Sequence, residues 1–162
     1  MGCTEVSAPR ARRNSAYACQ IALLGLLASL GCRGVARETS PDALSPFTSV
    51  SRGSTSQIQD PQNLVIGSAE GWGAFWARHA PGTVAPAVDF ASDVVVAVMA
   101  GQRRTAGYAV DILTIEGGTV ATTVTYRVTG PTPGALVAQV LTSPFHIVRL
   151  RRPGTAVRFE RR

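Results

Sequence analysis

The fold is decided by an uninterrupted apolar run in the second half of the chain, Val94-Val-Val-Ala-Val-Met-Ala100. Four of its seven residues are valine, whose branched side chain favours a β-strand. Gly101 ends the run. A strand that is apolar at every position, and not only at every second one, is buried on both faces. The run therefore predicts the central strand of a sheet.

Further strands are predicted on both sides of this run. They cover residues 64–66, 108–115, 119–128 and 145–150. The sequence Glu116-Gly117-Gly118 is typical of a hairpin turn, so the two strands that it joins are expected to pair antiparallel. Apolar residues alternate along the strand after this turn. The alternation predicts one core-facing set, namely Val120, Val124, Tyr126 and Val128.

A short amphipathic helix is predicted between the first strand and the central one. Ser68 is a suitable N-cap, and Pro81-Gly82 ends the helical pattern. Aromatic rings fall at helical spacing, which places Trp72, Phe75, Trp76 and His79 on one stripe. The stripe is interpreted as the face that docks on the sheet. An aromatic platform for a ligand is the alternative.

These elements predict a small α+β domain over residues 63–152. Its expected architecture is a small antiparallel β-sheet of about five strands with one helix packed on one face. Residues 33–62 are rich in Ser, Thr, Pro, Asp, Gly and Gln, which predicts a flexible linker. Residues 153–162 are predicted to form a basic tail.

The first 32 residues have the pattern of a secretory signal peptide. Arginines in the n-region precede the apolar run of residues 21–30, and Gly31 is a small residue before Cys32. The sequence Ser29-Leu-Gly-Cys32 resembles a bacterial lipobox, so Cys32 is the predicted lipidation site. Ordinary signal-peptide cleavage nearby is the alternative. The expected location is the bacterial cell envelope, as a lipoprotein anchored on the periplasmic side or at the outer surface.

Composition excludes several kinds of catalytic site. All 16 basic residues among the 162 are arginine, so there is no Walker lysine and no Schiff-base lysine. The sequence has no nucleophile elbow, no pair of carboxylates placed to converge and no metal-ligand cluster. Asp89 is interpreted as a brace of the turn before the central strand. We therefore expect a protein that is not an enzyme, with no catalytic residue, cofactor or metal.

Several short motifs, taken in order, resemble the PrcB C-terminal domain family. They are Val65-Ile-x-Ser68, Glu70-x-Trp72, Val88-Asp-Phe90, Val94-Val-Val-Ala-Val with Gly101, Thr105-x-Gly107-Tyr108 and Thr142-x-Pro144-Phe145-x-Ile147-Val148. The family is named for an accessory subunit of a secreted serine-protease complex. The resemblance implies an exported, non-catalytic binding or assembly module, and it carries over no catalytic residue.

The predicted function is that of a membrane-anchored accessory module. Its expected partners are another exported protein, with a protease as one candidate, and the membrane through the lipid anchor. Export argues against nucleic acid. A periplasmic protein that binds a small ligand or an anionic glycan is the alternative, because arginine clusters attract anions. The predicted partner contacts lie on one glycine-bounded turn, namely Arg103, Arg104, Thr105, Gly107 and Tyr108.

Overall fold

The computed structural model describes residues 44–162, which form seven strands and one α-helix. The predicted signal peptide, the predicted lipidation site Cys32 and the first part of the predicted linker lie outside the described residues. Within the described part of the chain, no helix has the length and apolar character needed to cross a bilayer.

The first sheet has four strands, all paired antiparallel, in the order β1-β6-β3-β2. Their bounds are β1 (Phe47–Gly53), β2 (Gln62–Ile66), β3 (Asp93–Met99) and β6 (Phe145–Arg151). The apolar run that the sequence marks as central is β3, and it lies between two neighbours and is buried on both faces.

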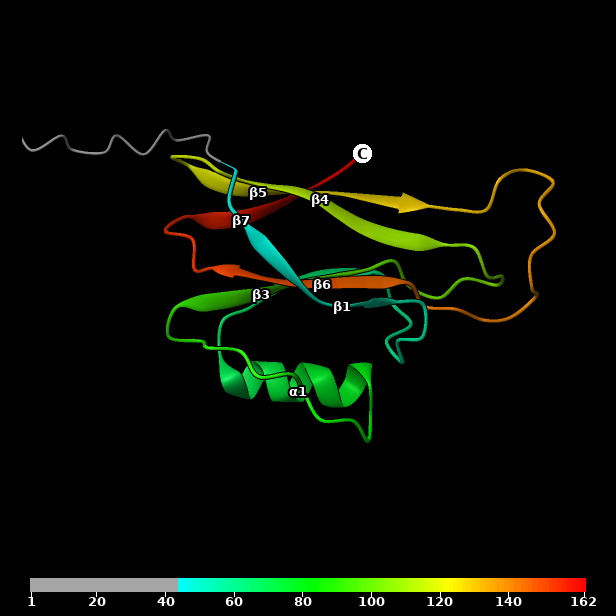
Figure 1. The fold of residues 1–162 in the computed structure, drawn as a ribbon, viewed down its shortest axis with the longest axis horizontal. Coiled ribbons are helices and arrows are strands. Elements are labelled where there is room, and N and C mark those ends of the chain that lie inside the picture. Colours follow the sequence, from blue (N-terminus) through cyan, green and yellow to red (C-terminus); the bar gives the residue numbers. More distant parts are fainter. Residues whose placement is uncertain (1–43) are drawn as a thin grey trace, which may run out of the picture. The chain divides into compact units, whose positions relative to one another are not determined.

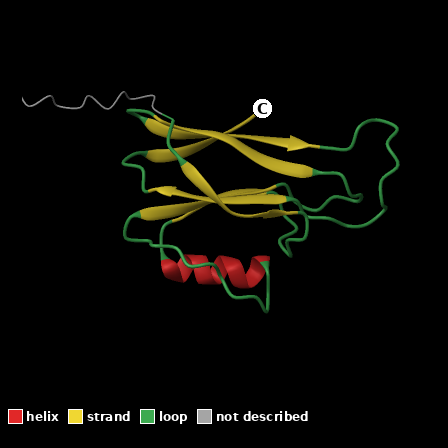
Figure 2. Ribbon diagram, viewed as in Figure 1, coloured by secondary structure: helices red, strands yellow, loops and turns green. Residues whose placement is uncertain are grey.

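The second sheet has three strands in the order β4-β5-β7, with β5 and β7 parallel. Their bounds are β4 (Ala109–Gly117), β5 (Ala121–Thr129) and β7 (Ala156–Arg161). Helix α1 (Ala69–His79) covers the outer face of the first sheet, so the described residues form three layers (Figures 1 and 2). The Ser68 side chain caps α1 by accepting from the backbone N–H of Gly71.

Alternation along β3 divides the core into two clusters. Val95, Ala97 and Met99 point toward α1 and pack with its aromatic side chains. The even-numbered residues of β3 point toward the second sheet and pack with β4, β5 and β6. Each cluster buries ten side chains, so both gaps between the layers are filled with apolar groups.

The α+β class is confirmed, and all five predicted strands are present. The structure differs from the prediction in having two sheets and two further strands. β1 lies in the predicted linker and β7 in the predicted basic tail. Both segments are half polar, because each is an edge strand with one face toward solvent. Their inward side chains, such as Phe47 and Phe159, pack on the second core cluster.

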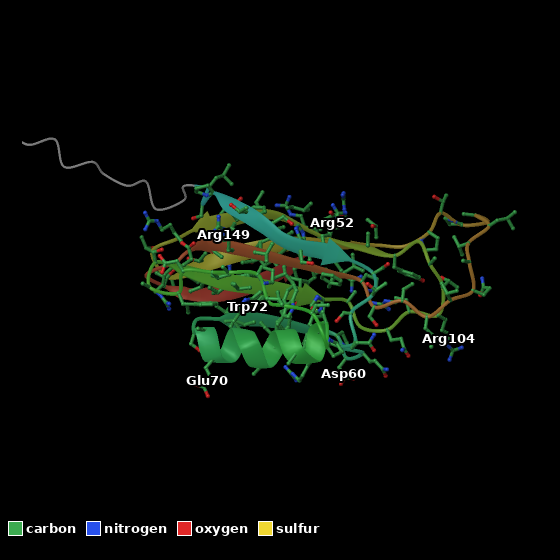
Figure 3. All side chains as sticks on the ribbon, turned by 60° about the horizontal axis from the view of Figure 1, so that its bottom comes forward. Arg52, Asp60, Glu70, Trp72, Arg104 and Arg149 are labelled. Carbon is green, nitrogen blue, oxygen red and sulfur yellow. The ribbon has the colours of Figure 1, made fainter. Side chains whose placement is uncertain are left out.

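The aromatic stripe of α1 is part of the core. Trp72, Phe75, Trp76 and His79 are all buried. Figure 3 shows Trp72 between α1 and the first sheet. The indole N–H of Trp72 donates to the carbonyl oxygen of Pro86, and the indole N–H of Trp76 donates to Thr83 Oγ1. The donor–acceptor distance is 2.9 Å in both hydrogen bonds. The docking interpretation therefore holds. The prediction that Val120 faces the core is wrong, because Val120 lies in the turn before β5 and is exposed. Val124 is buried as predicted.

Candidate functional site

The two sheets meet differently along their two sides. On one side the edge strands β1 and β4 are joined, and we call this the closed side. The backbone N–H of Ser45 donates to the carbonyl oxygen of Ile115 over 2.7 Å. Arg52 Nη2 lies 2.6 Å from Asp111 Oδ1. Figure 1 shows β1 running obliquely from the level of the second sheet down to the first.

The ring of His146 forms hydrogen bonds to β1 and β4 on the closed side. The pairing register shifts in β1 between Ser49 and Ser51, and in β4 between Ile112 and Thr114. The backbone N–H of Ile112 donates to His146 Nδ1 over 2.9 Å, and His146 Nε2 lies 3.1 Å from Ser49 Oγ. Because Nδ1 accepts, the ring proton sits on Nε2 and is donated to the hydroxyl. His146 therefore joins three strands in its neutral form.

Burial lowers the pKa of His146, and the positive charge of Arg52 lowers it further. The carboxylate of Asp111 opposes this shift, because it favours the protonated ring. Both ring nitrogens are engaged in hydrogen bonds within the core. The arrangement is that of a structural histidine.

His79 is held in a comparable way at the end of α1. Its Nδ1 lies 2.9 Å from Ser56 Oγ, which also accepts the backbone N–H of Ile58 over 3.1 Å. The ring lies edge-on to Phe145, with 4.3 Å between the ring centroids. Burial lowers the pKa of this histidine. The serine and the histidine together anchor the segment between β1 and β2.

Asp89 braces the turn before β3, as the sequence predicts. Its carboxylate accepts from the backbone N–H of Ala91 over 3.0 Å and from Ser92 Oγ over 2.7 Å. The hydrogen bond from Ser92 is the main cause that lowers the pKa of this carboxyl.

Among residues 44–162, no three side chains of His, Cys, Asp and Glu gather at a point where a metal could bind.

On the other side the edge strands are β2 and β7, and we call this the open side. Two cavities lie between these strands. One, of about 330 Å³, is lined by Pro61, Gln62, Asn63, Met99, Ala100, Arg103, Tyr126, Val128 and Arg161. We call it the arginine cavity. The other, of about 440 Å³, is lined by Val65, Val94, Arg152, Pro153, Thr155, Ala156 and Val157. The open side therefore combines two edge strands with two recesses.

The arginine cavity is built from polar groups that belong to both sheets. Arg103 Nη2 donates to the carbonyl oxygen of Ala100 over 2.9 Å, and its guanidinium carbon lies 5.4 Å from the centre of the Tyr108 ring. Its Nε–H is buried and has no hydrogen-bond acceptor in the described part of the chain. Asn63 Nδ2 donates to the Tyr126 hydroxyl over 3.2 Å, which joins the two sheets at this point.

The predicted contact residues have different positions. Arg103 turns inward to the cavity, and Tyr108 lies beneath it. The carbonyl oxygen of Thr105 accepts from Thr142 Oγ1 over 2.9 Å. Gly107 has a φ of +89°, and a side chain there would press on the next loop. Arg104 is exposed at the outer end of its loop (Figure 3). The five residues thus share one loop, but they form no single contact face.

Sequence reasoning missed the partners of Arg103 in the cavity. Arg161 was assigned to a basic tail, Asn63 to the first position of the predicted domain, before its first strand, and Tyr126 only to the core. A signal for the strand that ends at Arg161 was present, because apolar and polar residues alternate over residues 157–160 as in a half-buried strand. No local signal connects Asn63 with Tyr126, since they lie in different sheets.

Residues 94–151 match the PrcB C-terminal family model. The match confirms the resemblance seen in the sequence and runs from β3 to β6. No curated protein and no solved structure matches the chain. Arg103 and Tyr126 lie within the matched segment, whereas Asn63 and Arg161, which also line the arginine cavity, lie outside it.

Proposed function

We propose that the chain is a non-catalytic accessory module of the bacterial envelope, which binds another exported protein through its open side. An exported protease is the first candidate partner, and Cys32 is the proposed membrane anchor. The single observation that carries the binding surface is the pair of edge strands, β2 and β7, with recesses between them. An edge strand presents backbone N–H and C=O groups that a partner segment can pair with.

The family match supports the kind of partner. The histidine geometry supports a binding role over a catalytic one, because both rings hold backbone or hydroxyl groups within the core. The arginine cavity also suits an anionic glycan, which keeps that ligand as the second candidate.

The test is capture of a partner from detergent-solubilised envelopes of the native cells, with the affinity-tagged full chain as bait. We expect a stoichiometric exported protein with the unaltered chain. Val65 is 44% exposed on β2 and lines one of the two cavities, so Val65→Glu should abolish capture. The matched control is Val84→Glu, because Val84 is 92% exposed in the loop after α1.

Two results would contradict the proposal. One is capture of no protein above background by the unaltered chain. The other is an equal loss of partner capture with both variants, which would indicate a general effect of added charge.

The anchor is tested separately by the intact mass of the mature protein. A diacylated or triacylated Cys32 at the new N-terminus is expected, and an unmodified leader would contradict it.

A further inference from the structure

The arginine cavity has the chemistry of a site for a carboxylate. Two of its lining residues are arginine and none is acidic. Arg161 lies on the same side of β7 as Val157 and Phe159, whose side chains face the core between the sheets. Arg103 contributes a second guanidinium from the loop after β3. Two guanidinium groups beside a recess favour a planar anion that accepts paired hydrogen bonds.

The hydrogen bonds already present leave donors available. Arg103 Nη2 donates to the carbonyl oxygen of Ala100, and the buried Nε–H of the same side chain has no acceptor among the described residues. The Tyr126 hydroxyl accepts from Asn63, so its own hydrogen is free to be donated. The Arg103 guanidinium carbon lies over the Tyr108 ring, 5.4 Å from its centre, and a cation–π interaction favours this position. These contacts orient Arg103 at the wall of the cavity.

The position of the cavity indicates what carries the carboxylate. It lies at the Gln62 end of β2, and the second cavity lies at the Val65 end. A strand that adds to β2 with its carboxyl end in the arginine cavity runs antiparallel to β2, as every pair in this sheet does. Five residues of β2 span about 16 Å, which matches a peptide of similar length.

We infer that the open side binds the free C-terminus of an extended peptide, with its terminal carboxylate between Arg103 and Arg161 and an upstream side chain in the cavity beside Val65 and Val157. This inference rests on the proposed function, and it names the part of the partner that is recognised. Backbone pairing along β2 supplies affinity, and the carboxylate fixes the end and the register of the peptide.

The test compares two fluorescein-labelled libraries of random hexapeptides on the full chain by fluorescence anisotropy. One library ends in a free carboxylate and the other in a carboxamide. The free-acid library should bind at least tenfold more tightly. Arg161→Gln should remove this preference, and Arg103→Gln should do the same. The matched control is Arg158→Gln, because Arg158 is exposed on β7 and pairs with Glu160 at 3.0 Å.

Equal binding of the two libraries would overturn the inference. So would a preference that survives Arg161→Gln, the variant that removes no side-chain hydrogen bond observed among residues 44–162. Binding of a sulfated oligosaccharide in place of either library would assign the cavity to a glycan. If Arg161→Gln leaves partner capture intact whereas Val65→Glu abolishes it, the carboxylate site fails and the proposed function stands. If neither variant reduces capture of the partner, both proposals fail.

Discussion

The closed and open sides of the two sheets have the same origin, since each is a pair of edge strands. On the closed side, the edges are joined by a backbone hydrogen bond from Ser45, by the ion pair between Arg52 and Asp111 and by His146. On the open side, one hydrogen bond between Asn63 and Tyr126 crosses the gap beside the arginine cavity. The polar groups of the closed side pair with one another, whereas on the open side Arg103 has a buried Nε–H without an acceptor among the described residues. The two pairs of edge strands therefore differ in how far the protein's own polar contacts join them.

The largest effect is expected from removing the histidine of the closed side. His146→Ala leaves the buried N–H of Ile112 without an acceptor and opens a cavity, so the free energy of unfolding should fall by about 2–4 kcal/mol. Urea unfolding followed by tryptophan fluorescence measures this change. A loss no larger than that of an exposed substitution would contradict a structural role for the ring.

The next effect is a pH dependence of stability that comes from the neutral histidines. His79 and His146 have folded pKa values below the usual 6.5. Between the folded pKa and 6.5 the unfolded chain binds more protons, so the free energy of unfolding falls as the pH decreases through this window. Urea unfolding at pH values from 7.5 to 5 should show this slope.

The same pH series separates the two sides. In His146→Ala the slope should be smaller, since one of the two shifted groups is gone. Arg161→Gln on the open side should keep the slope of the unaltered chain. Stability that does not change between pH 7.5 and 5 would contradict the neutral, hydrogen-bonded state of both rings.

A smaller effect is expected from the ion pair of the closed side. A double-mutant cycle with Arg52→Met and Asp111→Asn compares the free energies of unfolding of the double variant and the two single variants. The coupling free energy should be about 0.5–1 kcal/mol, because Arg52 is half exposed. Asp111→Asn should also lower the pKa of His146 further, since that carboxylate raises it. NMR titration of the histidine ring measures the pKa, and an upward shift would contradict this assignment of charges.

The smallest effect is expected on the open side. The hydrogen bond from Asn63 to Tyr126 is exposed, so Asn63→Ala should reduce the free energy of unfolding by no more than about 0.5 kcal/mol. The same urea measurement applies. A loss as large as that of His146→Ala would remove the distinction between the two sides.

Much of the fold could be predicted from local patterns. The apolar run at residues 94–100, the hairpin signal at residues 116–118 and the aromatic stripe of the helix each correspond to an observed element. The edge strands β1 and β7 were missed because half of their side chains face solvent. Composition alone does not distinguish such strands from a linker or a tail.

The candidate site was predicted only in part. Arg103 was predicted as a partner contact because it lies in a glycine-bounded loop, and the structure places it in the lining of the arginine cavity. The prediction treated the loop as an outward contact face, although only Arg104 of its two arginines is exposed. The direction of a loop side chain depends on what packs beneath it, here the Tyr108 ring, and this contact has no periodic signature.

By itself, the sequence determined which segments are buried, because the spacing of apolar residues follows the period of a strand or a helix. It also carried the resemblance to the PrcB C-terminal family, whose model matches residues 94–151. Only the tertiary structure decided that the strands divide into two sheets, that His146 joins one side and that Arg103 and Arg161 line one cavity on the other. Those features join residues that lie far apart along the chain, and neither local propensity nor periodicity carries information about such pairs.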